Sequence, residues 1–249
     1  MNTGKLYDSQ AEKWKTYEES SYSWKFLEKP SFDKYLNNFY NNKTKVLDVG
    51  CASGRVIKHL ILKGIKSSNI TGIEPSAKLL EYAKKSLPNN VRLINSNLEN
   101  MVVEKENFDL VTSNMVFHYL DNESLKKGLN NIYDSLNSKG LLFFVDTDPD
   151  NNEIFKNPNN LNKWLEINSP WNTKLPFFNR HPRTLLTELL DIAGFDYVKG
   201  WPVKILDEGK INPELYKKYS STPSRIAALY KKVSEDNKKN RQGFIPSLV

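Results

Sequence analysis

Cysteine and long apolar runs are the features that this 249-residue sequence most clearly lacks. Its one cysteine, Cys51, has no second thiol for an internal disulfide and cannot build a Cys-based zinc site. No apolar run approaches the about 18 residues of a membrane span, and no signal peptide is visible. These absences predict a cytoplasmic protein without a membrane span, a disulfide or a bound metal.

A concentrated basic region is also missing from most of the chain. The net charge is +7, but the 36 Lys and Arg residues are scattered among 29 acids. Only residues 231–241 carry a dense basic cluster, and a solvent-exposed tail explains it better than a nucleic-acid partner does. The hydrophobic content of 39% is enough for the core of one α/β domain with additions.

One stretch, Val46–Val56, organises the rest of the chain. The apolar residues from Val46 to Val49 predict a buried parallel strand, and Gly50 and Gly54 follow in a tight turn. Apolar residues then recur at helical spacing, which predicts strand, glycine loop and helix. The first turn of such a helix offers unpaired N–H groups to an anionic or strongly polar ligand.

A second strand is predicted at 69–73, and Glu74 lies at its carboxyl end. A nucleotide-binding fold places an acid near this position, where its carboxylate accepts two hydrogen bonds from a ribose diol. Two neighbouring strand ends therefore offer complementary chemistry to one ligand.

These residues resemble the class I methyltransferases that use S-adenosylmethionine, in the small-molecule branch related to ubiquinone and menaquinone biosynthesis enzymes. The range Val46–Gly54 is similar to the first motif of that family, with Ala52 as the one departure from its glycines. Further matching segments are Phe108–Asn114, Val116–Leu120, Lys139–Phe144, Arg183–Thr184 and Ala193–Phe195. Together they cover roughly residues 44–200, and such a spaced set is more specific than any single member.

The resemblance implies a Rossmann-like α/β fold with a seven-stranded, mostly parallel sheet and helices on both faces. An N-terminal helical lid (1–42) precedes a cofactor-binding core (43–148), and an aromatic substrate cap (149–182) is inserted after strand five. The core resumes at 183–232 and ends in a tail (233–249). Residues 226–230 fit either strand seven or a helix.

Helix ends can also be predicted from the sequence. The apolar residues at 32, 35, 36, 39 and 40 predict a helix with Ser31 as its cap, and Ser76 and Asp121 are the caps expected for two later helices. His59 lies in the first core helix and is expected to have a structural or surface role.

The resemblance also implies a set of cofactor-binding residues. Tyr7 and Trp14 lie on one face of the N-terminal helix and are expected to close over the cofactor. The other expected residues are Asp48, Gly50, Cys51, Ala52 and Gly54 of the first motif, Glu74 and Pro75, Asn97 and Leu98 after strand three, and Asn114 and Met115 after strand four. Asn97 stands where the family commonly uses an acid to bind the adenine amino group, and its amide carbonyl can accept the same bond.

Methyl transfer from a sulfonium is an in-line displacement, so the protein contributes mostly alignment and exclusion of water. Candidate bases near the strand ends are His118, His181, Asp146 and Tyr7, and we favour His118. A histidine packed at a helix start would look the same in sequence, and His181 fits a structural role at a helix entry. The aromatic cap suits a flat or apolar small-molecule acceptor.

Two alternatives remain open from the sequence. A nucleic-acid methyltransferase has the same fold, but the family members that modify exocyclic amines have an Asn/Asp-Pro-Pro-Tyr/Phe motif where this chain has 113–116. A cofactor-binding protein without catalysis is also possible, although the glycine loop is intact. A nicotinamide dehydrogenase fits poorly, because the middle glycine and a separate catalytic domain are missing.

Overall fold

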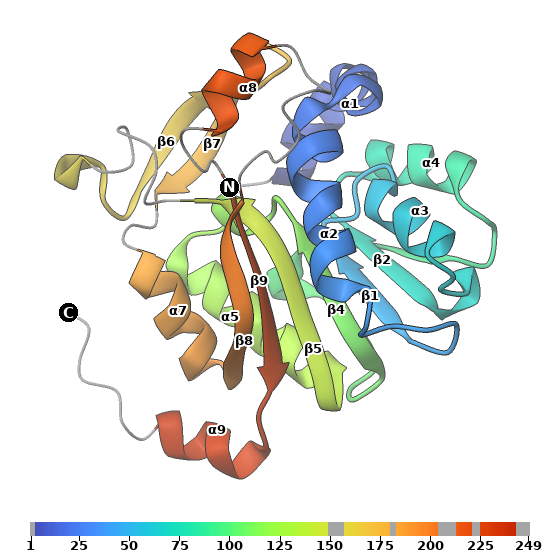
Figure 1. Cartoon of the computed structure of the whole chain (residues 1–249), viewed down its shortest axis with the longest axis vertical. Helices are drawn as coiled ribbons and strands as arrows, with labels where there is room; N and C mark the ends of the chain where they lie inside the picture. The colour runs from blue at the N-terminus through green and yellow to red at the C-terminus, as the bar shows by residue number, and fades with distance from the viewer. Residues whose placement is uncertain (1–2, 149–156, 180–182, 204–212, 221–224, 243–249) are drawn as a thin grey trace.

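The computed structural model describes residues 3–148, 157–179, 183–203, 213–220 and 225–242. Its centre is a seven-stranded sheet in the order β3-β2-β1-β4-β5-β9-β8, with helices on both faces (Figure 1). The strands are β1 (Val46–Val49), β2 (Ile70–Glu74), β3 (Arg92–Asn95), β4 (Phe108–Asn114), β5 (Leu136–Thr147), β8 (Phe195–Val203) and β9 (Arg225–Lys232). The predicted Rossmann-like α/β fold is confirmed.

The first five strands are parallel, and the last two are antiparallel to their neighbours. Residues 226–230, which fitted a strand or a helix, lie in β9 between β5 and β8. Small residues suit that strand, because a Cβ added to Gly200 of β8 would lie only 2.8 Å from the Ala228 Cβ. An alanine-rich sequence there reflects close strand packing and is not a helix signal.

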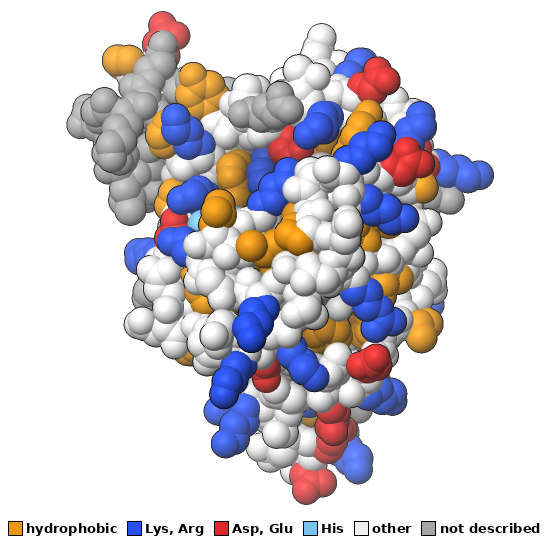
Figure 2. Space-filling view, turned by 90° about the vertical axis from the view of Figure 1, so that its right-hand side faces the viewer, with side chains coloured by type: hydrophobic (Ala, Val, Ile, Leu, Met, Phe, Trp, Pro, Cys, Tyr) orange, Lys and Arg blue, Asp and Glu red, His pale blue; other side chains and the backbone are white. Residues whose placement is uncertain are grey.

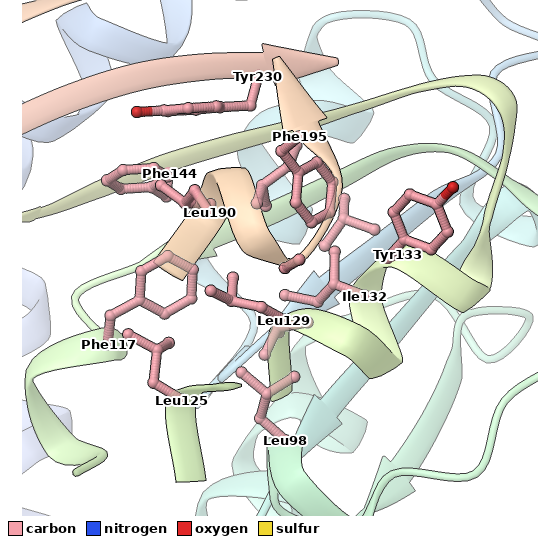
Figure 3. Packing of buried hydrophobic residues seen from close by; sticks show 14 of the residues in the cluster. Leu98, Phe117, Leu125, Leu129, Ile132, Tyr133, Phe144, Leu190, Phe195 and Tyr230 are labelled. Atoms are coloured by element: carbon pink, nitrogen blue, oxygen red, sulfur yellow. The ribbon is translucent and has the colours of Figure 1, made fainter. Parts of the chain in front are cut away.

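Alternation along the strands divides the core into two clusters. In β5, Phe143 and Val145 join the cluster beneath α2 (Lys29–Leu36), α3 (Arg55–Leu62) and α4 (Ala77–Ser86). Leu142 and Phe144 point into the cluster beneath α5 (Asn122–Ser135) and α7 (Arg183–Ile192). Figure 3 shows the second cluster, in which Phe144, Leu190 and Phe195 gather around the inner face of α5. Both faces of the sheet are therefore buried, as parallel strands require.

The longer helices are α1 (Thr3–Ser20), α2 (Lys29–Leu36), α3 (Arg55–Leu62), α4 (Ala77–Ser86), α5 (Asn122–Ser135), α7 (Arg183–Ile192), α8 (Pro213–Ser220) and α9 (Glu235–Gln242). One turn of π-helix, η1 (Trp24–Glu28), leads into α2. Short 3₁₀ turns are η2 (Ser67–Asn69), η3 (Leu98–Asn100), η4 (Phe117–Tyr119) and η6 (Pro158–Asn160). No helix in these described ranges is both long and apolar enough to cross a membrane.

The predicted caps are confirmed at two of three positions. The side chains of Ser76 and Asp121 accept from the backbone N–H of Leu79 and Ser124. Ser31 was predicted wrongly: it lies inside α2 and donates to the Leu27 carbonyl, because the π-helical turn already continues into α2. The helix ends at Leu36, so the predicted extension through residues 39 and 40 is also wrong.

His59 has the structural position that the sequence predicted. It is buried in α3, and its Nε2 lies 3.1 Å from Asp33 Oδ1 of α2. Burial lowers the pKa of His59 more than the nearby carboxylate raises it. This histidine therefore packs α2 on α3.

A two-stranded hairpin lies between β5 and α7. It consists of β6 (Lys163–Asn168) and β7 (Lys174–Asn179), which are antiparallel and stand apart from the main sheet (Figure 1). The sequence predicted only an aromatic cap over 149–182, and residues 149–156 and 180–182 of that range lie outside the described residues. The turn is closed by a hydrogen bond from Ser169 N to Thr173 O.

The predicted solvent exposure of the C-terminal basic cluster holds for Lys231 and Lys239 but is wrong for Lys232, Lys238 and Arg241. Lys232 and Lys238 are buried, and their ammonium groups lie 4.4 and 3.7 Å from the centre of the Tyr133 ring. Arg241 of α9 forms ion pairs with Asp191 and Asp196. The basic residues therefore attach α9 to the core, and charge density alone gave no sign of this.

Candidate functional site

A cavity of about 660 Å³ lies at the carboxyl ends of β1, β2 and β4. This is the edge at which open α/β sheets bind ligands. Helix α1 forms one wall with Tyr7, Trp14 and Tyr17, and the β6–β7 turn forms another with Ser169 to Trp171. The cavity is therefore covered by two segments that lie outside the sheet.

The glycine loop forms the floor of the cavity. Gly50 has φ +68°, and a Cβ added to it would lie 2.4 Å from Val116 Cγ2, so no side chain fits there. The N–H groups of Gly50 and Cys51 donate to Ile73 O at 2.8 and 3.0 Å, which ties the loop to β2. Ala52 has φ +48°, a conformation that favours glycine, so the one departure from the family motif stands in a strained position.

We expect Ala52→Gly to raise the free energy of unfolding. Glycine adopts this left-handed conformation without the about 1–2 kcal/mol of strain that the alanine Cβ causes, and the greater freedom of glycine in the unfolded chain offsets about 0.4–1 kcal/mol of this gain. Urea unfolding measures the net change. Ala83→Gly, in the buried interior of α4, is the matched control and should instead destabilise by at least about 1 kcal/mol. A loss of stability in Ala52→Gly equal to that of the control would contradict the strain argument.

Glu74 joins the glycine loop to the start of α4. Its Oε2 accepts from Ala52 N at 3.0 Å and its Oε1 from Ser76 N at 2.9 Å. Burial raises the pKa of Glu74 to about 7, although both backbone bonds act in the opposite direction. The carboxylate lines the cavity with lone pairs left for further donors.

Asn97 and Glu99 form a polar corner of the cavity next to Leu98. Asn97 Nδ2 donates to Glu99 Oε1 at 2.8 Å, which leaves Asn97 Oδ1 as its acceptor atom. Glu99 Oε2 is buried and has no hydrogen-bond partner within the described ranges. The corner therefore offers acceptors to a donor such as an exocyclic amino group, and Glu99 was not foreseen from the sequence.

His118 is buried beside the cavity and paired with an acid. Its Nδ1 lies 2.6 Å from Asp146 Oδ1, and Asp146 Oδ2 accepts from Phe117 N at 2.7 Å. Burial raises the pKa of Asp146, but the charge and hydrogen bond of His118 and two backbone N–H bonds outweigh it and hold the pKa below its ordinary value. An ionised Asp146 therefore fixes the orientation of the His118 ring, which also stacks on Phe177 at 5.1 Å.

Tyr7 of α1 meets Tyr119 of η4 at the same place. Tyr7 Oη donates to Tyr119 Oη at 2.5 Å, and the two rings pack edge to face. Burial raises the pKa of Tyr119 to about 12 and that of Tyr7 well above its ordinary value. Both hydroxyls stay protonated near neutral pH, which favours His118 over Tyr7 as a base.

Helix α1 is also attached to the loops that follow β1 and β2. Asp8 Oδ1 accepts from Ser76 Oγ at 2.6 Å and from Lys78 N at 3.0 Å, both at the start of α4. Near the other end of α1, Ser53 Oγ donates to Glu18 Oε2. The helix is thus held across the loops that follow β1 and β2.

Most of the predicted site residues line this one cavity. They are Tyr7, Trp14, Gly50, Cys51, Ala52, Glu74, Pro75, Asn97, Leu98, Asn114, Met115 and His118. Asp48 and Gly54 lie behind it: Asp48 is buried and accepts from Thr112 Oγ1 at 2.7 Å, and Gly54 faces Leu87. His181 lies outside the described residues. In the described part of the chain, no group of three or more His, Cys, Asp or Glu side chains could hold a metal ion.

Sequence reasoning missed several polar residues of the cavity. Glu28 of η1 is buried, and its Oε2 accepts from Asn114 Nδ2 at 3.2 Å and from Arg55 Nη2 at 3.4 Å. Arg55 follows Gly54 directly. Its position in the first helical turn after the glycine loop could have indicated that it lines the cavity. Glu28 and Trp171 gave no comparable signal, because they reach the cavity only through the tertiary fold.

Comparison with known protein families gives a match to a methyltransferase domain over residues 46–140. A curated relative is the malonyl-[acyl-carrier protein] O-methyltransferase of Priestia megaterium, which is 28% identical over 131 residues, or 52% of this chain and 46% of the relative. The chain spans about half the length of the curated relatives that it matches.

Solved structures share the fold over most of the chain. A putative S-adenosylmethionine-dependent methyltransferase from Listeria monocytogenes has a TM-score of 0.66 and 19% identity, over 84% of this chain and 99% of that one. The 1,6-didemethyltoxoflavin-N1-methyltransferase of Burkholderia thailandensis, solved with its substrate and S-adenosylhomocysteine, has a TM-score of 0.61 and 13% identity, over 94% of this chain and 91% of that one. Residues 46–140 therefore match a methyltransferase domain, and the chain shares its fold with S-adenosylmethionine-dependent methyltransferases of known structure.

Proposed function

We propose that this protein transfers a methyl group from S-adenosylmethionine to an oxygen, nitrogen or carbon atom of a small-molecule acceptor. The observation that carries the proposal is the single cavity in which the glycine loop, Glu74, Asn97 and Asn114 meet His118. One end of the cavity has the chemistry of a nucleoside site, and the other contains a histidine oriented by an acid. Few other functions need both in one space.

The cofactor fits the polar atoms that line this cavity. Glu74 is the residue that we assign to the ribose diol, and Asn97 Oδ1 or Glu99 Oε2 accepts from the adenine amino group. Asn114 Oδ1 is buried and has no hydrogen-bond partner among the described residues, so it can accept from an ammonium group. Gly50, Cys51, Ala52, Pro75, Leu98 and Met115 form the surrounding walls, and Tyr7 and Trp14 cover them.

The bound cofactor supplies a methyl group on a sulfonium, which is electrophilic without help from the protein. We assign to His118 the removal of the acceptor's proton, because Asp146 holds its ring and stabilises the imidazolium that forms. The Tyr7–Tyr119 pair and the aromatic residues of the β6–β7 turn exclude water from the reacting atoms. The remaining rate enhancement comes from alignment of acceptor and methyl group.

Several observations support a small acceptor over a nucleic acid. The cavity is covered by α1 and the β6–β7 turn, and on the face shown in Figure 2 the Lys and Arg side chains are spread among acidic and uncharged ones. The two named methyltransferases above act on a malonyl-[acyl-carrier protein] and on 1,6-didemethyltoxoflavin, by their names. Within the described residues, the observed surface therefore offers no continuous basic stripe on that face.

Calorimetric titration with S-adenosylhomocysteine tests whether the protein binds the cofactor. The reaction is tested by incubating the protein with S-adenosylmethionine and a panel of small amines, phenols, carboxylic acids and enolisable ketones. Turnover is measured as the release of S-adenosylhomocysteine. We expect binding and turnover on at least one acceptor class. Salt-sensitive methylation of RNA in place of these acceptors would support the nucleic-acid alternative. Binding without turnover on any acceptor would support a catalytically silent protein, and no binding would end the proposal.

Affinity for S-adenosylhomocysteine should increase with pH. The pKa of Glu74 is raised to about 7, and only its ionised form can accept from both ribose hydroxyls. About a tenth of such a group is ionised at pH 6, so we expect the dissociation constant to be about tenfold larger at pH 6 than at pH 8. Titrations across this range measure it.

Stability should change in the opposite direction over the same range. Glu74 and Asp48 both have pKa values raised to about 7 by burial, so the folded state retains protons that the unfolded state loses. The free energy of unfolding therefore falls as pH rises from about 4.5 to about 7. Asp48→Asn is the control: it should flatten part of the stability profile and leave the pH dependence of binding in place. A binding profile that also flattens would assign the effect to Asp48.

A further inference from the structure

Three buried N–H donors in the cavity wall lack a hydrogen-bond partner within the described residues. They are Trp14 Nε1, Arg55 Nη1 and Trp171 Nε1, and their residues come from α1, α3 and the β6–β7 turn. A buried donor without an acceptor is unfavourable, and native proteins rarely leave one unpaired. Three of them in one wall indicate a ligand that accepts hydrogen bonds.

The three side chains are packed together. The Trp14 and Trp171 rings are 5.1 Å apart between centroids and meet edge to face, and the Arg55 guanidinium carbon lies 5.8 Å from the Trp14 centroid. The same guanidinium carbon lies 4.7 Å from the Trp24 centroid. The guanidinium is therefore packed against two indole rings before any ligand arrives, which lowers the entropy cost of binding.

The charge of Arg55 is only partly balanced by its acidic neighbour. Arg55 Nη2 lies 3.4 Å from Glu28 Oε2, and that same oxygen also accepts from Asn114 Nδ2. Glu18, another acid that lines the cavity, accepts from Ser53 Oγ. A buried guanidinium with a long, shared ion pair favours a second anion.

A carboxylate is the group that matches all three donors. Its two oxygens offer about four lone-pair sites and a negative charge, whereas a neutral carbonyl offers two sites and no charge. We infer that Arg55, Trp14 and Trp171 form a carboxylate-binding site in the cavity. This inference rests on the proposed function, because the carboxylate belongs either to the amino-acid half of the cofactor or to the acceptor.

Two adenosine ligands test whether the site binds the carboxylate of the cofactor. S-adenosylhomocysteine carries the carboxylate, and 5′-deoxy-5′-methylthioadenosine retains the nucleoside and the sulfur without it. If the site binds the cofactor, Arg55→Met, Trp14→Phe and Trp171→Phe weaken S-adenosylhomocysteine binding, Arg55→Met by at least tenfold, and leave methylthioadenosine binding within twofold. Phenylalanine keeps an aromatic ring and removes only the indole donor.

The second source is tested on protein saturated with S-adenosylhomocysteine. ¹⁹F NMR titrations compare 4-fluorobenzoate with its uncharged analogue 4-fluorobenzamide. If the site binds the acceptor, 4-fluorobenzoate binds at least tenfold more tightly than the amide, and the three variants abolish this preference without changing S-adenosylhomocysteine affinity.

Matched controls separate these effects from misfolding. Arg92→Met removes an exposed arginine, and Trp164→Phe changes an indole on the same hairpin that is 40% exposed; both should bind every ligand as the wild type does. Thermal unfolding checks that each variant is folded. If neither carboxylate ligand responds to the three substitutions, the carboxylate site is overturned while the proposed function stands. If the wild type binds neither adenosine ligand, the proposed function fails first.

Discussion

Glu74→Ala should weaken the binding of S-adenosylhomocysteine by about 30-fold or more. The substitution removes the acceptor for the ribose diol, and a hydrogen bond to a charged group contributes about 1.5–3 kcal/mol, where 1.4 kcal/mol is a tenfold change in affinity. It also leaves Ala52 N and Ser76 N without the acceptor that positions the glycine loop. Isothermal calorimetry on folded protein measures the change.

Glu104→Ala is the matched control for this substitution, because the Glu104 side chain is 66% exposed and lies away from the cavity. It should bind S-adenosylhomocysteine as the wild type does. Adenosine and 2′,3′-dideoxyadenosine differ only in the ribose diol, so comparing their affinities isolates its contribution. Any displacement of the glycine loop in Glu74→Ala weakens both ligands equally, and the additional loss of affinity should appear only for adenosine. An unchanged affinity for S-adenosylhomocysteine in a folded Glu74→Ala protein would remove Glu74 from the cofactor site.

His118→Ala should lower kcat by about 100-fold or more, because general-base catalysis contributes about 10²–10⁴-fold. The affinity for S-adenosylhomocysteine should stay within about twofold, since the assigned adenosine contacts lie on other residues. Asp146→Asn should give an intermediate loss, because the His118 ring remains but its charged partner does not. The measurement is methyl transfer to whichever acceptor class gives turnover in the panel.

His59→Ala is the control that separates catalysis from the loss of a buried imidazole. Both histidines are 5% exposed and each is paired with an aspartate, but His59 packs α2 on α3 away from the cavity. Both variants should lose stability, and only His118→Ala should lose turnover. Equal kcat values for the two variants would reject His118 as the base and leave it a packing role.

The sheet and the part of the cavity around the glycine loop and Glu74 were predictable because their signals are local. Val46–Gly54 encodes a buried strand, a turn and a helix start within a few residues, and Glu74 follows its own strand directly. Parallel strands bring their carboxyl ends to one edge, so these residues had to meet. Asn97 and Asn114 reached the same cavity for the same reason.

The acceptor end was not predictable in this way. The aromatic content of residues 149–182 indicated a covering segment, but the hairpin depends on pairing between two short strands with few sequence signals. Glu28 and Trp171 reach the cavity only when α1, η1 and the hairpin pack over the sheet. The C-terminal lysines show the same limit, since their burial depends on Tyr133, about a hundred residues earlier.

The attachment of α1 to the loops around the cavity has a kinetic consequence under the proposed function. Tyr7 holds it to η4, Asp8 to the start of α4 and Glu18 to the loop before α3. A nucleoside bound beneath the helix exchanges with solvent only when these bonds open, so the rate of their opening sets an upper limit on kcat.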